Sequence, residues 1–467
     1  MKSKSVTILV IVVISLATFI SQAIAEDAKV VVSPQIDIFV GPKYQGWWGN
    51  PVAFDSVNER FLVVWTDGGV ETSPIDLCGH LVNADGSLYG STIAISTSEG
   101  QELVPQIAFD PHAGRFLVVW QDNRTYSWEV YGQLVNTDGS LYEGNFYISP
   151  PDTNTGVIPD VAFDTVNRRF LVVWQDWYDT ISAQSVGADS FLYGPIIQIT
   201  NSGARPKIVF DSNNGRFLVT WGAAGCVYGQ IINGDGTPYV SEFMIGYYDA
   251  DSSYLPSLAF DPIYSRFLQM WDTGHSGQLI NTDGTLYGGE ISLFPDNNYT
   301  NIYSNFVVFD TTCERFLIGA EILHPYNGIA GRLLNPDGSV DGEIFPIWEF
   351  SYTGTTAIFA AYGSRQTGSL VVWAGDPYFS VSRNDIFGAF AKCPWCTAHI
   401  AGDLNDNCKV DFGDLSILGS QWRQAPGSPS ADIAPEVLDN FVDTLDLAVL
   451  CEHWLECNLD PPEACWE

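Results

Sequence analysis

The sequence predicts an all-β chain folded as a seven-bladed β-propeller, followed by a small α-helical, calcium-binding domain. The first observation is a segment of the form FDxxxxRFLVVW that recurs along the chain. Its copies lie about 47 to 55 residues apart, a period typical of propeller blades rather than of helical solenoids. The second observation is an isolated strand before the first copy, which matches a strand missing from the last copy.

The Phe-Asp pair at the start of the repeat locates the copies. Six copies carry it, at Phe54-Asp55, Phe109-Asp110, Phe163-Asp164, Phe210-Asp211, Phe260-Asp261 and Phe309-Asp310. The seventh copy is decayed and keeps only Phe359 and the segment 370–373. The β-branched and aromatic run after each Arg predicts a strand that is buried on both faces. The Trp that closes this run is assigned to the core, at Trp65, Trp120, Trp174, Trp221, Trp271 and Trp373.

Each copy supplies up to four strands. The third strand ends in an Asn-x-Asp-Gly turn such as 136–139, and Asp-Gly predicts a hairpin because glycine accepts a positive φ. The seventh copy stops after its third strand, 385–390, whereas the isolated strand 35–40 resembles a fourth strand. We therefore expect residues 35–40 to complete the last blade and to close a propeller that spans residues 28–391.

The repeat also sorts the loops onto two faces. The constant face carries the turns between strands one and two and between strands three and four, which repeat their motifs. The variable face carries the other two connections, which differ from copy to copy, and functional residues usually lie on such loops. The repeated Asp and Arg, such as Asp110 and Arg115, are expected to cap turns or form ion pairs.

Aromatic residues are frequent in the variable loops, beside Asp and Asn. Exposed flat rings can stack on sugar rings, so the sequence favours polysaccharide as the ligand. The alternative is that most of these rings pack locally. The candidate binding residues are Trp47, Trp48, Trp128, Trp177, Tyr178, Tyr247, Tyr248 and Tyr378.

The chain is strongly acidic, with 55 Asp and Glu against 20 Lys and Arg. Such a surface repels nucleic acid, because phosphate binding needs basic side chains. It suits Ca²⁺, a cationic partner or a neutral polymer, or it simply keeps an extracellular protein soluble. Residues 1–25 have a basic start, an apolar run and an Ala-Ile-Ala site, which predict a secretory signal peptide. We expect a secreted or surface-attached mature chain without a membrane span.

The segment after the propeller contains a calcium-loop pattern. Residues 402–415 place oxygen ligands at positions 1, 3, 5, 9 and 12 of an EF-hand-like loop, and the Lys409 carbonyl would serve at position 7. Cys408 replaces the usual glycine at position 6. The expected Ca²⁺ ligands are Asp403, Asn405, Asn407, Asp411 and Asp414.

A second copy of the loop and helix follows. Leu, Leu and Trp at i, i+3 and i+7 make one apolar helix face in both copies, at Leu415, Leu418, Trp422 and at Leu447, Leu450, Trp454. The second loop contains extra residues, so whether it binds metal stays open. Its candidate ligands are Asp432, Asp439, Asp443 and Asp446.

These paired units, with Asp at position 12, resemble a dockerin domain over residues 400–457. The resemblance implies Ca²⁺ in each loop and docking onto a cohesin-like protein that joins the chain to a larger assembly. Positions 10 and 11 are Phe412-Gly413 and Thr444-Leu445, a departure from the small hydroxyl residues with which the family often reads its partner. The alternative is a structural Ca²⁺ domain that packs on its own propeller.

Six of the nine cysteines belong to this end of the chain, which also contains a linker at 392–399 and a tail at 458–467. We expect three disulfides among Cys393, Cys396, Cys408, Cys451, Cys457 and Cys465, with the pairing left open. Cys78, Cys226 and Cys313 are expected to be unpaired.

The predicted function is that of a secreted, non-catalytic binding or scaffold-attached protein. Its propeller binds polysaccharide or protein, and the calcium-dependent module tethers it. The first alternative is a propeller glycoside hydrolase or polysaccharide lyase carried by the dockerin-like module, and the second is a purely structural surface protein. A glycosidase needs two facing carboxylates. The sequence selects no pair from Asp67, Asp122, Glu129, Asp176, Asp249, Asp251 and Asp376.

Overall fold

The computed structural model of the chain divides into two units, Val32–Lys392 and a second one that comprises Met1–Val31 and Cys393–Glu467. Each unit is described by itself. The residues that the structure describes are 30–41, 45, 51–68, 74–151, 156–248, 256–271, 276–294, 304–322, 328–349, 355–375, 385–393, 395–396, 404, 410, 412–424, 431, 433, 442, 444–454, 457 and 459–460.

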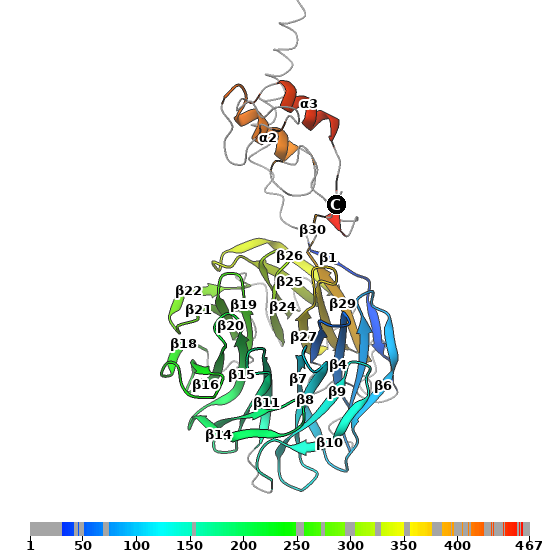
Figure 1. Ribbon diagram of the computed structural model, residues 1–467, viewed down its shortest axis with the longest axis vertical. Helices are drawn as coiled ribbons and strands as arrows, with labels where there is room; N and C mark the ends of the chain where they lie inside the picture. Colours follow the sequence, from blue (N-terminus) through cyan, green and yellow to red (C-terminus); the bar gives the residue numbers. More distant parts are fainter. Residues whose placement is uncertain are drawn as a thin grey trace, which may run out of the picture. The chain divides into compact units, whose positions relative to one another are not determined.

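Seven antiparallel sheets form the larger unit, each with the strand order of the sequence repeat (Figure 1). Blades one to three consist of β3 (Val52–Asp55), β4 (Arg60–Asp67), β5 (Asp76–Asn83) and β6 (Leu88–Ser96); β7 (Glu102–Asp110), β8 (Arg115–Asp122), β9 (Glu129–Asn136) and β10 (Leu141–Tyr147); and β11 (Val157–Asp164), β12 (Arg169–Gln175), β13 (Ile181–Val186) and β14 (Leu192–Thr200). Blades four to six consist of β15 (Ala204–Asp211), β16 (Arg216–Ala223), β17 (Cys226–Asn233) and β18 (Phe243–Tyr247); β19 (Ser257–Asp261), β20 (Arg266–Trp271), β21 (Ser276–Asn281) and β22 (Leu286–Ser292); and β23 (Asn305–Asp310), β24 (Arg315–Ile322), β25 (Gly328–Leu334) and β26 (Val340–Glu349).

The seventh blade closes the ring with strands from both ends of the repeat array. It consists of β27 (Thr355–Tyr362), β28 (Ser369–Gly375) and β29 (Asp385–Lys392), with β1 (Val31–Val32) and β2 (Ile36–Phe39) on β29. Residue Ile36 lies opposite Gly388, so the predicted pairing of residues 35–40 with the last blade is confirmed. The innermost strand of each blade contacts that of the next, and β27 contacts β3, which makes the seven-bladed propeller a closed one.

The repeated tryptophans lie between the blades and are fully buried, as the sequence predicts. A second repeated contact joins the Phe of the Phe-Asp pair to the Phe after the Arg, as in Phe109 and Phe116, whose ring centroids are 4.7 Å apart. In the first five blades, the residue four positions before the Trp pairs with the first Phe of the repeat. In the seventh blade that residue is Ser369, and it pairs with Tyr362, so Tyr362 takes the first Phe position. The assignment of Phe359 to that position is therefore wrong, because the register of this decayed copy is three residues further along.

The constant face repeats one turn in each of the first six blades. The Asp caps it, and in blade one Asp55 Oδ1 accepts hydrogen bonds from the backbone N–H groups of Val57 and Asn58, at 2.9 and 3.1 Å. The Arg does not pair with this Asp but stacks on a tyrosine at or just before the fourth strand, and Arg60 lies 3.6 Å from the ring centre of Tyr89. Five blades repeat this stack. The expectation of a turn cap is confirmed for Asp.

Blade six shows what determines the stack. The tyrosine position is occupied there by Asp341, and Arg315 forms an ion pair with it at 2.6 Å instead. The arginine thus joins the second strand to the fourth in either case.

Among its described residues, the smaller unit contains two helices that contact each other, α2 (Phe412–Ser420) and α3 (Thr444–Glu452), and the short pair β30 (Trp395–Cys396) and β31 (Leu459–Asp460). Leu415, Leu418 and Leu450 are buried in one cluster, with Trp422 and Trp454 packed partly against it. Both tryptophans follow the last residue of their helix. Within the described residues, no helix is long and apolar enough to cross a membrane.

The cysteines differ from the prediction in two respects. Cys313 is disulfide-bonded, as are Cys393 and Cys457, so the expectation that Cys313 is unpaired is wrong. Cys451 is an exposed thiol on α3, so the six cysteines of the C-terminal segment do not form three disulfides among themselves. Cys78 and Cys226 are thiols.

Candidate functional site

The variable face displays some of the predicted aromatic rings and buries others. Trp177, Tyr178 and Tyr247 are 59%, 84% and 64% exposed, whereas Trp128 and Tyr248 are partly buried. Trp47, Trp48 and Tyr378 lie outside the described residues. The alternative of local packing therefore holds for two of the five described residues, and three remain available to a ligand.

Trp177 and Tyr178 form the tip of a rigid turn between β12 and β13. The side chain of Asp176 accepts hydrogen bonds from the backbone N–H groups of Tyr178 and Thr180, at 2.7 and 2.8 Å. The Asp176 N–H in turn donates to the Thr180 carbonyl at 2.9 Å. Because these hydrogen bonds fix the backbone of the turn, the chain loses little backbone freedom when a ligand binds to the two exposed rings. Asp176 thus has a structural role in this turn.

Sequence reasoning missed Tyr126, at the corresponding turn of the neighbouring second blade. Its side chain is fully exposed and its φ is 67°, a conformation that bulky residues rarely adopt. The Tyr126 N–H donates to the Asn123 carbonyl at 2.8 Å, which closes the turn. Blades two and three therefore each present aromatic rings from the same hairpin position.

Below the Tyr126 turn lies a buried charge cluster. Glu102, Asp122 and Glu129 are opposite one another on β7, β8 and β9, and none of them is exposed. The Arg124 guanidinium contacts Asp122 by two nitrogens and lies 3.3 Å from Glu102. Burial raises the pKa of Glu102, and hydrogen bonds from Ser96 and Ser98 partly oppose this rise.

This cluster bears on the hydrolase alternative. Two of the candidate carboxylates, Asp122 and Glu129, are closed off from solvent, and the first is held by Arg124, so they do not face a substrate. Asp67 accepts a hydrogen bond from Gln45 at 2.8 Å. Asp249, Asp251 and Asp376 lie outside the described residues.

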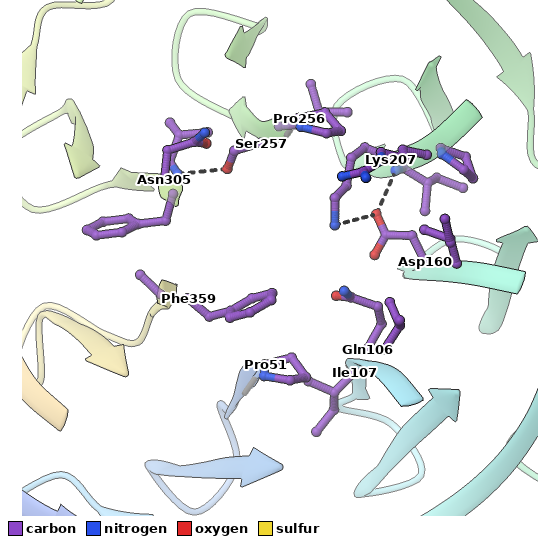
Figure 2. Close-up of a pocket in the computed structure, with 18 of the residues that line it drawn as sticks. Pro51, Gln106, Ile107, Asp160, Lys207, Pro256, Ser257, Asn305 and Phe359 are labelled. Atoms are coloured by element: carbon purple, nitrogen blue, oxygen red, sulfur yellow. Dashed lines mark hydrogen bonds and ion pairs between the residues drawn. The ribbon is translucent and has the colours of Figure 1, made fainter. Parts of the chain in front are cut away.

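A cavity of about 570 Å³ lies on the propeller axis and is lined by the inner strand of every blade (Figure 2). Its described lining comes from the starts and middles of these strands, which begin at the variable face. One register position contributes a residue from each blade, and the seven are Pro51, Gln106, Asp160, Lys207, Ser257, Phe306 and Phe359. This ring divides into a polar arc in blades two to five and an apolar arc in blades six, seven and one.

The polar arc contains an ion pair. Lys207 Nζ lies 3.7 Å from Asp160 Oδ2, which also accepts the backbone N–H of Ile208 at 3.0 Å. Burial raises the pKa of Asp160, and the charge of Lys207 opposes the rise. In the apolar arc, the ring of Phe359 points into the cavity (Figure 2). The misassigned Phe of the seventh copy is therefore a cavity residue.

Strained backbone shapes the rim of this cavity. Val104, Ile158 and Arg205 have φ of 53°, 51° and 53°, each within a β-bulge at the start of its inner strand. Bulges of this kind re-aim side chains and recur beside binding sites. A glutamine of the preceding blade pins two of them, since Gln121 and Gln175 accept the N–H groups of Ile158 and Arg205 at 2.9 and 3.0 Å.

Two of the predicted calcium ligands lie among the described residues. Asp414 and Asp446 are buried, and they accept the backbone N–H groups of Leu404 and Ile433, both at 2.7 Å. Each thereby ties its helix to the second residue of its predicted loop. The other predicted ligands, Asp403, Asn405, Asn407, Lys409, Asp411, Asp432, Asp439 and Asp443, lie outside the described residues.

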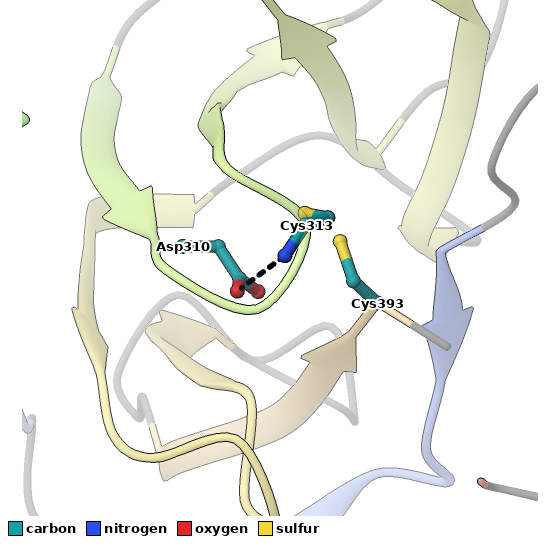
Figure 3. A group of neighbouring side chains, drawn as sticks. All are labelled: Asp310, Cys313 and Cys393. Carbon is teal, nitrogen blue, oxygen red and sulfur yellow. Dashed lines mark hydrogen bonds between the residues drawn. The ribbon is translucent and has the colours of Figure 1, made fainter. Parts of the chain in front are cut away.

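Asp310, Cys313 and Cys393 bring ligand-type atoms within 4.8 Å of one another (Figure 3). Metal-binding cysteines are thiolates, whereas both of these are disulfide-bonded. Asp310 instead caps its turn by accepting the backbone N–H of Thr312 at 2.7 Å. Asp310 and Cys313 belong to the blade-six turn, and Cys393 directly follows β29.

Comparison with known proteins finds similar folds among solved structures but does not assign the chain to a family. No family model and no curated protein match the chain. A chain of the mitotic checkpoint complex superposes with a TM-score of 0.50 at 9% identity, covering 79% of this chain and 94% of that one. The β-propeller domain of Myceliophteria thermophila Cps50 (Swd1) gives 0.49 at 10% identity, over 77% of this chain and 99% of that one. At these identities the likeness concerns the fold alone.

Proposed function

We propose that the chain is a secreted binding protein whose propeller holds a polysaccharide on its variable face. The observation that carries the proposal is the Trp177–Tyr178 turn, which presents two exposed rings on a hydrogen-bonded backbone. Aromatic side chains supply large contact area at low entropy cost, and sugar rings offer flat C–H faces to stack on them. The acidic surface disfavours a polyphosphate such as nucleic acid.

The test is a panel of polysaccharides scored for retention on the immobilised full-length protein and for release of reducing ends. We expect retention without release, and a loss of at least about tenfold in affinity in the Trp177→Ala/Tyr178→Ala variant. Phe191→Ala is the matched control, because Phe191 is 68% exposed in the same blade but belongs to a constant-face turn. Release of reducing ends would instead favour the hydrolase or lyase, and no retention by any polymer would favour a structural role.

We further propose that the C-terminal unit is a dockerin-like, calcium-dependent tether to a cohesin-like protein. Buried Asp414 and Asp446 fit Ca²⁺, because each is a hard anionic oxygen ligand at the end of a loop rich in further oxygen ligands. Asp403, Asn405, Asn407, Asp411 and Asp414 would hold the first ion, with the Lys409 carbonyl, and Asp432, Asp439, Asp443 and Asp446 the second.

Calorimetry of the full chain with CaCl₂ tests the tether. We expect heat of binding that the Asp403→Ala variant reduces and that Asp337→Ala, an exposed Asp of a propeller turn, leaves unchanged. Equal heats for wild type and the Asp403→Ala variant would contradict the assignment of the first loop.

A further inference from the structure

The axial cavity differs in charge from the rest of the molecule. The whole chain has 55 acidic residues against 20 basic ones, but the described residues that line the cavity include two cations, Arg205 and Lys207, and one carboxylate, Asp160. The described lining of the cavity thus contains more cations than carboxylates, in contrast to the chain as a whole. Solvent-exposed acidic groups that lie further from the ligand than a Debye length of about 8 Å are largely screened by salt, whereas Lys207 lies in the cavity itself.

The lysine has capacity left for a ligand. Its contact to Asp160 is long, at 3.7 Å, and its side chain is 23% exposed, whereas an ammonium offers three donors. Asp160 is 8% exposed and positions the lysine, but it does not occupy all three of the ammonium's hydrogen-bond donors. A carboxylate on the ligand can therefore accept from Lys207 Nζ without displacing Asp160.

Neutral polar groups flank this cation. The amide of Gln106 points into the cavity (Figure 2) and has no hydrogen-bond partner among the described residues. Gln106 supplies both donors and an acceptor, which suits hydroxyl groups. Ser257 is already engaged, since its Oγ accepts the N–H of Val307 at 3.0 Å.

The opposite arc offers an apolar wall. The Phe359 ring points toward the polar arc, and Pro51 lies beside it (Figure 2). A ligand that fills the cavity therefore needs one apolar face and one anionic, hydroxylated edge. The volume of about 570 Å³ falls in the range of small-molecule sites.

We propose that the axial cavity binds a sugar ring that bears a carboxylate, that is, a uronate. Its carboxylate lies against Lys207, its hydroxyl groups bond to Gln106, and its C–H face packs on Phe359. The inference rests on the proposed polysaccharide-binding function and specifies an acidic sugar for a second site, apart from the Trp177–Tyr178 turn.

The experiment is calorimetry of the full-length protein with sodium glucuronate, its methyl ester, glucose and sodium acetate. We expect glucuronate to bind at least about tenfold more tightly than the methyl ester, because a charge-assisted hydrogen bond is lost in the ester. Acetate should bind more weakly than glucuronate, because it lacks the ring. Binding of glucuronate should weaken as salt rises.

Three variants locate the site. Lys207→Gln should abolish the preference for acid over ester, and Lys207→Arg should restore it. Phe359→Leu should weaken the binding of the acid and of the ester by a similar factor. If Lys207→Gln fails to fold, this variant tests whether the ligand binds in the cavity. Trp177→Ala/Tyr178→Ala should leave glucuronate binding unchanged.

Equal affinity for the acid and the ester, or an unchanged preference in a folded Lys207→Gln variant, would overturn the inference. Absence of any glucuronate heat would overturn it too, and retention of a polymer through Trp177 would then leave the proposed function intact. Conversely, if the protein binds glucuronate but retains no polymer, the uronate site in the cavity would be supported and polymer binding at the Trp177–Tyr178 turn would be contradicted.

Discussion

The two faces of the propeller differ in how regularly their residues repeat, although the same strands lead to both. On the constant face, an Asp cap recurs in six blades and an Arg–Tyr stack in five. On the variable face, blade two buries three carboxylates, two of which contact Arg124. Blade three exposes Trp177 and Tyr178, and three inner strands start with strained bulges. We conclude that residues repeated from blade to blade stabilise the blades, whereas residues that differ between blades are the ones available to bind a ligand.

The largest expected effect comes from the charge cluster of the variable face. Arg124→Leu would leave Glu102 and Asp122 buried without their cation, and we expect a loss of about 3–5 kcal/mol in the free energy of unfolding. The constant-face control is Arg169→Leu, which removes a stack on Tyr193 worth about 0.5–1 kcal/mol. Denaturant titration of both variants measures the difference. Similar losses would mean that the two faces do not differ in this way.

A smaller effect is expected from restoring the repeat on the constant face. In blades one, three and four, an Asn such as Asn167 donates its amide to the second oxygen of the capping Asp, at 2.7 Å in that blade. Blade five has Tyr264 at this position, and buried Asp261 Oδ2 has no hydrogen-bond partner among the described residues. Burial raises the pKa of Asp261, in line with this deficit.

Tyr264→Asn should therefore raise the free energy of unfolding by about 0.5–1.5 kcal/mol. The same substitution would remove the exposed contact of Tyr264 with Glu314, so Tyr264→Phe serves as the control for that loss. A destabilised Tyr264→Asn variant beside an unchanged Tyr264→Phe variant would contradict the role assigned to the amide.

The smallest effect is a dependence on pH. The third strand carries a glutamine in blades two to five, and Gln133 donates to the Tyr142 carbonyl at 3.0 Å, whereas blade one has His80 at this position. Burial lowers the pKa of His80. The neutral imidazole is thus favoured by folding. Its contribution to stability is present above the unfolded pKa of about 6.5 and is lost as pH falls through the lower folded value.

His80→Gln should remove this component. Between about pH 7 and 5, the free energy of unfolding should fall less steeply in the variant than in the wild type, by less than the one-proton limit of about 1.4 kcal/mol per pH unit. Chemical denaturation at a series of pH values measures both slopes. Parallel curves would show that another group accounts for the acid sensitivity.

The sequence predicts those parts of the fold that depend on periodicity. The copies, the buried tryptophans and the closing strand at residues 35–40 follow from hydrophobic alternation and turn residues, which act locally. The position of Phe359 does not follow, because a decayed copy lacks the Asp and Arg that mark the register, and only the pairing of Tyr362 with Ser369 fixes it.

The candidate site was predicted in part for a similar reason. Aromatic content pointed to the variable loops, but exposure depends on turn geometry, which separates Trp177 from Trp128. Tyr126 was missed because nothing in its neighbours shows that the backbone takes a positive φ there. The bond of Cys313 joins residues whose proximity arises only in three dimensions.

The closing strand has a consequence for how the ring assembles. The backbone of Phe390 bonds to Ser33, 357 residues earlier in the chain, so the last blade is complete only after all seven repeats have emerged. Contacts of such sequence separation slow folding far more than they reduce final stability, because the entropy of closing a loop grows only with the logarithm of its length. Until that contact forms, β29 presents an unpaired edge that can recruit a foreign strand. A protein of this design is therefore most prone to aggregation in the interval just before its two ends meet.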